Sequence, residues 1–588
     1  MNQIFRGINI EIGDGNPGAI GLYAQGAQGM AVNDVQVDMT SGGGFAGFAG
    51  GNGAGGSHVN IAAMGGRYGV FFEQADGAAL VLSGTFEGQT ISAVHYTAIS
   101  GGPKPWESSI RSASLVGLTI RHNGTGPAID AGQGHAITVL DTIVHCDHQG
   151  DVNQTVGIRA RGNVYLQDTF FVECGVILTQ PGTFHPDLTR TPRGYPISHA
   201  IAVARGTNTL NRGAEVIGNL MVIDGVRLPN HTLNRMSPVA AVPSGVVSSR
   251  TPWVSNQWPS IENMTDAVVD CGAKGDGTTD DTDALQHCLN ENQHVLLPKG
   301  LFRISSTLLL RPGASLIGIS QTHSVIAPMT TGFKSEFLNK KHKNANKTFA
   351  PLVRTAITGN VTIAFVGLVT WWHLPSIFTL EWRARGGLWR SNYETRVCEC
   401  LWLQNYASRS KNFPCAQPVA LATPKTQIRG GGVFVNFVND EDILFTDHTN
   451  YRHLYVGDGG TGSHPLQLYA LNMEHAMSEA NLEINGAHQG VEIVSLKIEG
   501  SNTILWVRDC SKVELFSLGG GADPFPNSSY LPSDFAPYTP TILRVERTSP
   551  FKFVNVNDGG RGNEGQPIQP IPPTGGVLVS SWTYFTHP

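Results

Sequence analysis

Short apolar strands recur along the first part of the chain at a nearly constant spacing. The stretches "MAVNDVQVDM", "SHVNIAAMGG" and "AALVLSGTFEG" place Val35, Val59 and Val81 in comparable positions, at steps of 24 and 22 residues. Apolar and polar residues alternate in each stretch, which is the pattern of a strand with one buried face. A repeat of this length indicates units that stack and share a continuous core.

The same spacing continues in the strands that follow. The stretches "SLVGLTIRHNG", "TVLDTIVHCDHQG" and "YLQDTFFVECG" put Gly117, Asp141 and Asp168 in matching places, at steps of 24 and 27 residues. Because each repeat holds several short strands and almost no helical pattern, we predict an all-β fold of right-handed parallel β-helix type. A β-sandwich is the alternative, but its strands do not require similarity at this period.

A break in the pattern divides the chain into two β-helices in tandem. Residues 226–266 are rich in Pro, Ser and Asn, which is linker composition. We therefore predict a first parallel β-helix over residues 1–225 and a second over 267–588. Within the second, Asp281 is the predicted N-cap of a short helix near 281–290 that covers the open end of the stack.

Composition agrees with this fold and limits the partners. Charged residues make up 15% of the chain and glycine supplies 70 of 588 residues, whereas helical proteins need more charge to coat their outer faces. A net charge of −6 and a pI near 6.4 provide no electrostatic footprint for nucleic acid or a membrane surface. The longest apolar run, residues 361–372, is too short to span a membrane.

The cysteines suggest structural bonds rather than a metal centre. Cys398 and Cys400 form "CEC" without the Cys and His spacing of a zinc site, so we expect no metal and no cofactor. Cys271 and Cys288 flank one short unit and can pair in an oxidising compartment. Seven N-x-S/T sequons are compatible with secretion and an extracellular location; they begin at Asn123, Asn153, Asn230, Asn263, Asn346, Asn360 and Asn527.

A family resemblance enters at the start of the predicted second β-helix. The stretch "GAKGDGTTDDTDAL" followed by "LLPKGLFRIS" resembles the opening segment of the pectate-lyase-like β-helix superfamily. We interpret its Asp276, Asp280 and Asp281 as turn and cap residues, because the Glu that completes a calcium loop of the EF-hand type is missing. Superfamily members with two β-helices carry such a segment on each, and the first β-helix here has none. We therefore expect the N-terminus to be incomplete, which makes the missing signal peptide uninformative.

Acidic residues gather in residues 471–500, a part of the chain that otherwise reads as alternating strand. Glu474 and Glu499 are 25 residues apart, which is one repeat of the stack. Consecutive rungs of a β-helix lie about 4.8 Å apart, so the two carboxylates are predicted to approach each other on one face. Two neighbouring carboxylates do not both ionise easily, and the one with the raised pKa can act as a general acid. Glycoside hydrolysis requires such a pair.

Across nearly its whole length the chain resembles glycoside hydrolase family 55, the laminarinases that act exolytically on β-1,3-glucan. In that family a Glu-His on a strand of the second β-helix precedes the catalytic acid by about one rung, and here these are Glu474-His475 and Glu499 in "KIEG". The resemblance implies an inverting reaction in a cleft between the β-helices, with Glu499 protonating the leaving oxygen and Glu474 tuning or relaying the proton. Lys497 departs from the family at a position that shapes the sugar subsite.

Further candidates for binding substrate or water follow from the same resemblance. Gln74 and Gln89 match polar residues of the first β-helix that hold the attacking water, and His475 is a hydrogen-bonding partner for a carboxylate. Sugar sites also use aromatic platforms. Four tryptophans are available for this purpose, although core packing is an equal alternative for each: Trp106, Trp371, Trp372 and Trp389.

Two other functions remain open on the same scaffold. A polysaccharide lyase would need a base and a cation beside a uronate, for which Lys497 and the basic run in residues 334–347 are candidates. A non-catalytic carbohydrate-binding protein would bind glycans without turnover, since a scaffold alone does not define function. In each case we expect a monomer that takes a polysaccharide or oligosaccharide.

Overall fold

The computed structural model describes most of the chain. The residues outside the described part are 1–3, 26–28, 52–54, 74–77, 97–110, 133–134, 148–154, 181–187, 190–196, 206–219, 228–231, 255–257, 331–332, 334–349, 372–373, 375, 398–425, 440–452, 458–464, 475–479, 489, 501–502, 523–542, 557–576 and 580–588.

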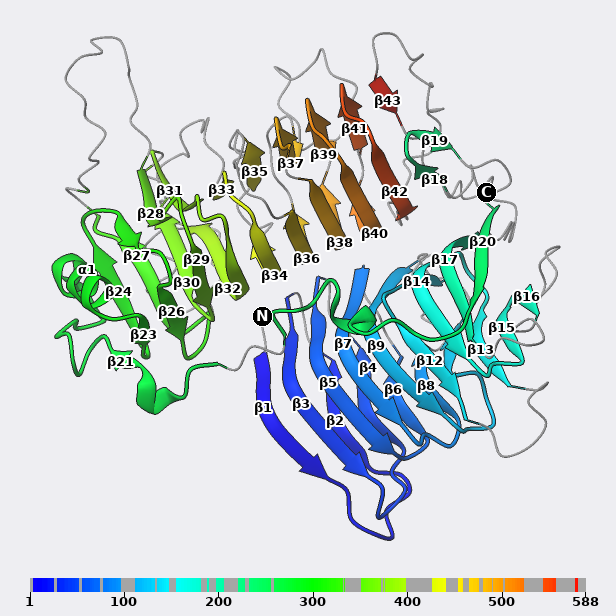
Figure 1. Ribbon diagram of the computed structural model, residues 1–588. Helices are drawn as coiled ribbons and strands as arrows, with labels where there is room; N and C mark the ends of the chain where they lie inside the picture. The colour runs from blue at the N-terminus through cyan, green and yellow to red at the C-terminus, as the bar shows by residue number, and fades with distance from the viewer. Residues whose placement is uncertain are drawn as a thin grey trace, which may run out of the picture.

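The first β-helix is built from two long sheets (Figure 1). The ten-stranded sheet contains β1 (Ile4–Glu11), β3 (Ala31–Met39), β5 (Ser57–Gly65), β7 (Ala78–Glu87), β9 (Arg111–His122), β11 (His135–Leu140), β12 (Ile143–Cys146), β14 (Val164–Val172), β17 (Ile197–Arg205) and β20 (Thr232–Val239). The eight-stranded sheet contains β2 (Ile20–Gln25), β4 (Ala46–Gly51), β6 (Tyr68–Phe72), β8 (Ser92–Tyr96), β10 (Ile129–Ala131), β13 (Val156–Ala160), β15 (Val176–Thr179) and β16 (Leu188–Thr189).

The second β-helix has the same construction. Its sixteen-stranded sheet contains β18 (Leu220–Ile223), β19 (Val226–Arg227), β21 (Thr265–Asp266), β22 (Asp276–Asp280), β23 (His294–Leu297), β24 (Gly300–Ile304), β26 (Ser315–Gly318), β27 (Ser324–Pro328), β29 (Asn360–Ala364), β30 (Gly367–Trp371), β32 (Gly386–Val397), β34 (Gly432–Asn439), β36 (Leu466–Glu474), β38 (Val491–Gly500), β40 (Val513–Ala522) and β42 (Phe551–Val556). Its nine-stranded sheet contains β25 (Leu308–Leu310), β28 (Ala350–Thr355), β31 (Ile377–Trp382), β33 (Thr426–Ile428), β35 (Leu454–Gly457), β37 (Ala480–Asn485), β39 (Thr503–Arg508), β41 (Leu543–Glu546) and β43 (Val577–Val579).

Most neighbouring strands pair in parallel, as successive rungs of a stack must. Inward-facing apolar residues of both sheets fill one core in each β-helix. A single rung buries too little surface to be stable, and stacking joins the rungs into a continuous core. The parallel β-helix fold expected from the sequence is confirmed, and the β-sandwich alternative is wrong.

The strands of the ten-stranded sheet bend at a fixed position. Gly117, Asp141 and Asp168 have left-handed φ angles of 66°, 51° and 49°. Register places Leu140 between Val116 and Gln167, so the three left-handed residues are stacked, as their spacing predicts. Gly and Asp suit the left-handed conformation better than most residues do.

The valines of the first repeats align less well. Val59 pairs with Asn33 on one side and Leu82 on the other, so it stands out of register with Val35 and Val81 by one or two residues. Loop lengths differ between rungs, and a fixed step in sequence therefore drifts against the structural register.

The predicted linker contains strand. After β17 the chain first pairs β18 with β42 of the second β-helix, then returns to the first β-helix as β20, antiparallel to β17. The connection between the two β-helices is thus shorter than the 226–266 predicted from composition. Thr232–Val239 alternates weakly, and its pairing with a distant strand is what makes it a strand.

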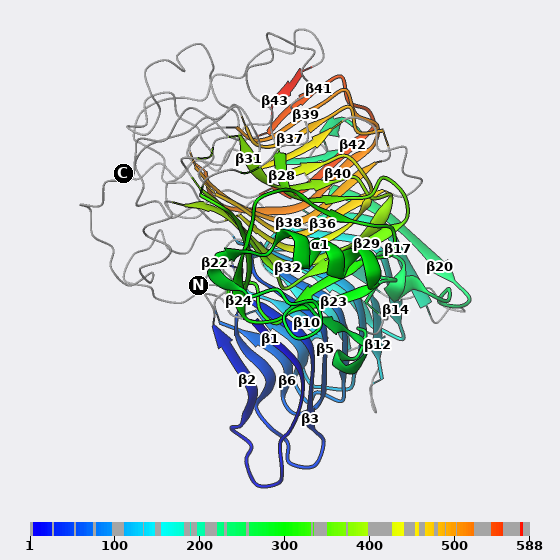
Figure 2. The ribbon, with the colours of Figure 1, turned by 90° about the vertical axis from the view of Figure 1, so that its left-hand side faces the viewer.

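The second β-helix opens with the predicted helix, α1 (Thr282–Glu291), whose N-cap residue is Asp281. Figure 2 looks at the molecule from this end and shows α1 in front of the strands. Leu285 and Leu289 are buried in the core of the second β-helix. The Asp281 carboxylate accepts hydrogen bonds from the backbone of Lys274 and Gly275, so it fixes the preceding turn rather than the helix end.

Two disulfides are present in the described residues. Cys271–Cys288 fastens the opening segment to α1, which confirms the predicted pair, and Cys146–Cys174 joins neighbouring rungs of the first β-helix. Cys510 is buried and free. No helix in the described part of the chain has the length and apolar character needed to cross a membrane.

Candidate functional site

The two β-helices pack through the ten-stranded and sixteen-stranded sheets (Figure 1). Hydrogen bonds cross between them, from Ser517 to Thr138 at 2.9 Å and from Ser495 to the carbonyl of Ala79 at 3.2 Å. The middle of this interface is apolar and closed, so a cleft can lie only at its edges. The apolar residues include Val59, Leu80, Leu82, Val116, Leu140 and Tyr165 from the first β-helix, and Val435, Tyr469, Ala470, Val494, Phe516 and Val554 from the second.

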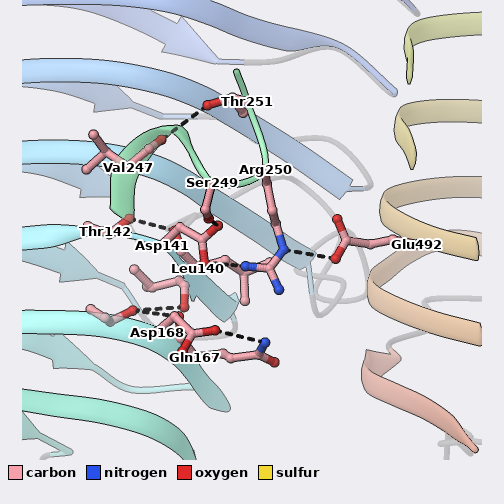
Figure 3. Close-up of polar contacts among 12 residues, drawn as sticks. Leu140, Asp141, Thr142, Gln167, Asp168, Val247, Ser249, Arg250, Thr251 and Glu492 are labelled. Atoms are coloured by element: carbon pink, nitrogen blue, oxygen red, sulfur yellow. Dashed lines mark hydrogen bonds and ion pairs between the residues drawn. The ribbon is translucent and has the colours of Figure 1, made fainter. Parts of the chain in front are cut away.

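One edge of the interface is closed by the segment that connects the β-helices, and we call it the linker edge. Arg250 donates to Asp141 of the first β-helix and, at 2.9 Å, to Glu492 of the second (Figure 3). Ser249 donates to the other oxygen of Asp141. The Tyr469 hydroxyl donates to Glu492 at 3.2 Å. Every member of this group therefore has a partner.

Electrostatics at the linker edge are those of a structural ion cluster. The side chains of Asp141, Glu492 and Arg250 are 2%, 10% and 14% exposed. Burial alone would lower the pKa of Arg250, but Glu492 and Asp141 outweigh it and raise that pKa. Burial raises the pKa of Asp141, and Arg250 and Ser249 offset the rise in part. Glu492, which belongs to the acidic run seen in the sequence, thus serves to hold the two β-helices together.

The opposite edge contains the predicted acid pair, and we call it the acid edge. Positions 474 and 499 are direct partners in the register of β36 and β38. The one-rung relation predicted from their 25-residue spacing is confirmed, while the catalytic role of Glu474 and Glu499 stays a prediction. Position 521 of β40 follows in the same row and is glycine, so the row of acids ends there.

Two polar residues precede the acids on the same strands. Asn472 and Lys497 are register partners, 0% and 2% exposed, and lie between residues that point into the core of the second β-helix. Asn472 instead faces the first β-helix, because a Cβ on Gly55 would lie 2.6 Å from the Asn472 Cβ. Gly55 has a left-handed φ of 64°, which suits glycine, and it permits this close approach. The acid edge is therefore also a boundary between the two β-helices.

Asn472 is unusual in its hydrogen bonding. Neither its side-chain oxygen nor its nitrogen has a hydrogen-bond partner among the described residues, although the side chain is fully buried. Leaving such a group unpaired costs about 1–3 kcal/mol, so native proteins rarely keep one without a reason. This unsatisfied amide lies two residues before position 474 on the same strand.

Two sequence-predicted residues are structural in the described part of the chain. Gln89 is 0% exposed, and its amide nitrogen lies 2.9–3.2 Å from the carbonyl oxygens of Ala63, Glu87 and Gly65. Trp371 is also 0% exposed and donates from its ring nitrogen to the Pro328 carbonyl at 2.9 Å. Backbone carbonyls thus hold both side chains in the framework, so neither is carried forward as a substrate contact.

The remaining candidates divide by location. Trp389 is fully buried in the second core. Lys497 lies at the acid edge, as described. The others fall outside the described residues: His475, Gln74, Trp106, Trp372 and the basic run at 334–347.

The described residues hold no cluster of His, Cys, Asp or Glu that could bind a metal. Asp276 accepts from the backbone nitrogens of Thr278 and Thr279 at 2.8 and 2.7 Å, which confirms its interpretation as a turn residue. These hydrogen bonds keep the pKa of Asp276 below its usual range.

Comparison with known proteins agrees with the opening segment of the second β-helix. Residues 267–371 match the sequence profile of a family described as Rhamnogalacturonase A/epimerase, pectate lyase-like. This stretch runs from the start of the second β-helix to the end of β30 and contains the motif on which the superfamily resemblance rests. The matched segment is pectate-lyase-like, and families of this type contain carbohydrate-active enzymes.

Two further similarities are to one curated protein and one solved structure. A stretch of 75 residues, 12% of this chain, is 44% identical to the "Non-secreted LysM effector LysM19" of Penicillium expansum, and the match spans only 6% of that protein. The solved structure "Geobacillus virus E2 - ORF18" is similar over 55% of this chain and 66% of that chain, with 12% identity and a TM-score of 0.22.

Proposed function

We propose that this protein is a secreted glycoside hydrolase that cleaves a polysaccharide at the acid edge. Glu499 is the general acid, and Glu474 sets its protonation or relays the proton, with His475 as a hydrogen-bonding partner. The observation that carries the proposal is the direct register pairing of positions 474 and 499, next to a buried Asn472 amide that has no hydrogen-bond partner among the described residues.

Several features support the details of this proposal. Rungs about 4.8 Å apart bring partner carboxylates near the separation of retaining enzymes, about 5 Å, and an offset brings them to the 6.5–9.5 Å of inverting ones. The resemblance to laminarinases favours inversion and exolytic action on β-1,3-glucan. The Asn472 amide offers a donor and an acceptor to a sugar hydroxyl or to the attacking water, since the described residues occupy neither. Gln74 and Trp106 remain proposed substrate contacts from the first β-helix.

Secretion is supported by the covalent structure. Disulfides persist in oxidising compartments, and the described residues contain two. Asn123, Asn263 and Asn360, which begin three of the sequons, are all exposed. Expression in a secreting eukaryotic host tests this part separately. The mass of the secreted protein is expected to fall on enzymatic deglycosylation.

A lyase is the second candidate, favoured by the pectate-lyase-like segment and by Lys497 at the acid edge. β-Elimination from a uronate leaves an unsaturated product that absorbs in the ultraviolet, whereas hydrolysis releases reducing sugar without this absorbance. A panel of β-1,3-glucan, other neutral glycans and polygalacturonate, assayed for both signals, separates the reactions. Reducing sugar from a neutral glucan is the expected result.

The same panel tests the residue assignment. Glu499→Gln is expected to lower the rate by about 10²–10⁴-fold, the usual contribution of a general acid, without changing the thermal midpoint. Proton NMR of the first product identifies its anomer and so distinguishes inversion from retention. Wild-type protein that binds a glycan but turns over none would identify a binding protein instead.

A further inference from the structure

A cluster of rings and charges lies on the outer face of the eight-stranded sheet, away from both edges described above. One row of this face runs across four rungs, and its register partners are Phe71, His95, Asp130 and Arg159. The neighbouring row, Val70, Val94, Ile129 and Ile158, fills the core of the first β-helix. Because side chains alternate along a strand, the first row faces outward.

Aromatic rings form one half of this cluster. The Phe71 ring lies 4.9 Å from Phe45 and 4.8 Å from Tyr68, measured between centroids. His95 stacks on Phe71 at 5.0 Å with an interplanar angle of 11°. All four side chains remain partly exposed. They therefore present a continuous aromatic surface to the outside, over the neighbouring rungs of β4, β6 and β8.

Charged groups form the other half. Asp130 accepts from Arg159 Nε at 2.8 Å and Nη2 at 2.5 Å, and its carboxylate lies 3.2 Å from His95 Nδ1. Burial acts to raise the pKa of Asp130, but the hydrogen bonds from Arg159 and His95 outweigh it and lower the pKa to about 2. The Asp130 side chain is 10% exposed and the Arg159 side chain is 42% exposed. Asp130 is therefore held close to the sheet, whereas Arg159 remains open to solvent.

The arrangement has no evident structural purpose. Rings that serve only packing are buried in the core of this β-helix, as Phe48 and Phe72 are. The cluster also lacks a free acid, because Asp130 is held ionised by its guanidinium partner. The cluster is therefore suited to binding rather than to acid–base catalysis.

We infer that this face is a second glycan-binding surface, separate from the acid edge, that takes a stretch of uncharged polysaccharide lying across β6, β8, β10 and β13. Sugar rings stack their C–H faces on Tyr68 and Phe71, and their hydroxyls bind Asp130 and Arg159, which offer paired acceptors and donors. The Asp130 carboxylate and the Arg159 guanidinium neutralise each other, so this pair offers a polyuronate no net attraction. The inference shares with the proposed function only the class of ligand.

Affinity electrophoresis of the full chain tests this surface. Soluble β-1,3-glucan, soluble β-1,4-glucan and polygalacturonate are cast into separate native gels. At least one neutral glucan is expected to retard the wild type more than polygalacturonate does. Tyr68→Ala and Arg159→Gln are each expected to weaken that binding about tenfold, the loss of a stacked ring or of a charged hydrogen bond. Two variants are used so that one remains if the other fails to fold.

A second group of a histidine, a phenylalanine and an aspartate, on the ten-stranded sheet, supplies the control. His199 stacks on Phe170 at 4.1 Å and lies 3.5 Å from Asp168, but Phe170 is 3% exposed, and no further ring stacks on the pair among the described residues. His199→Ala should leave retardation unchanged. Equal retardation of Tyr68→Ala, Arg159→Gln and wild type overturns the inference, as does a wild type that no neutral glucan retards. Retardation is independent of cleavage, so failure of the Glu499 assignment leaves this test intact.

Discussion

The two edges of the interface between the β-helices bury polar groups in different ways. At the linker edge, Arg250 lies between Asp141 and Glu492, and every charge has a partner of opposite sign. At the acid edge, Asn472 is as deeply buried, yet its amide has no hydrogen-bond partner among the described residues. A satisfied cluster holds parts together, whereas a buried group without a partner calls for an explanation, and a bound ligand is the one proposed here.

Strand β38 connects the two edges. Glu492 lies before the apolar Val494 at the centre of the interface, and position 499 lies beyond it. Two acids seven residues apart on one strand thus have opposite predicted roles, one structural and one catalytic. The difference comes from their neighbours and not from the strand itself. Glu492 pairs with the Arg250 cation, whereas position 499 has position 474 as its register partner.

The largest expected effect concerns stability at the linker edge. Arg250→Ala leaves Asp141 and Glu492 buried without a cation, and it should lower the free energy of unfolding by about 3–5 kcal/mol. Urea denaturation measures the change. Arg547→Ala removes an exposed pair with Asp509 and should change the stability far less. Equal costs for the two variants would show that the linker edge is not a buried clamp.

At the acid edge the expected loss is in activity. Asn472→Ala should reduce hydrolysis about 10- to 100-fold with little change in stability, because the amide makes no hydrogen bond in the described protein. Initial rates and thermal midpoints are measured together. Asn481 is the matched control, since it is equally buried and donates to the Met473 carbonyl at 3.1 Å. Asn481→Ala should destabilise by about 1–2 kcal/mol; a similar cost for Asn472→Ala would contradict the distinction.

A smaller effect tests whether an unpaired polar group is enough to mark a site. His58 lies in the first core against Phe72, with no hydrogen bond to either ring nitrogen among the described residues. Burial lowers the pKa of His58 from 6.5 to about 3. The folded protein keeps this ring neutral while the unfolded chain protonates it, so stability falls as pH drops from about 6.5 toward 3. By pH 5 the loss is about 2 kcal/mol.

His58→Phe should remove this part of the pH dependence and leave catalytic rates within about twofold, since no acid pair adjoins the residue. Thermal unfolding at pH 5 and pH 7 measures the first effect, and initial rates at pH 7 measure the second. A large loss of activity in a well-folded His58→Phe protein would mean that an orphan polar group signals function wherever it lies.

Features that depend on local or periodic chemistry can be predicted from the sequence. The stacked positions of Gly117, Asp141 and Asp168, the helix beginning after Asp281 and the Cys271–Cys288 bond all follow from short patterns. The one-rung relation of positions 474 and 499 follows from the repeat length.

What the sequence did not indicate depends on long-range packing. Arg250 lies in a segment that reads as linker, and its two partners are 109 and 242 residues away. Asn472 sits in an ordinary alternating strand, and only the approach of Gly55 shows that it faces the other β-helix. The family resemblance suggests Gln89 and its residue type suggests Trp371, but backbone hydrogen bonds assign both side chains to the framework.

The most direct test compares the two acids of β38 through the variants Glu492→Gln and Glu499→Gln. For each variant the hydrolysis rate is measured on the best substrate of the glycan panel, and the thermal midpoint is measured on the protein alone. The account predicts that Glu499→Gln loses about 10²–10⁴-fold in rate at an unchanged midpoint, and that Glu492→Gln keeps its rate within about threefold while its midpoint falls. Full activity of Glu499→Gln, or loss of activity in a stable Glu492→Gln, would contradict it.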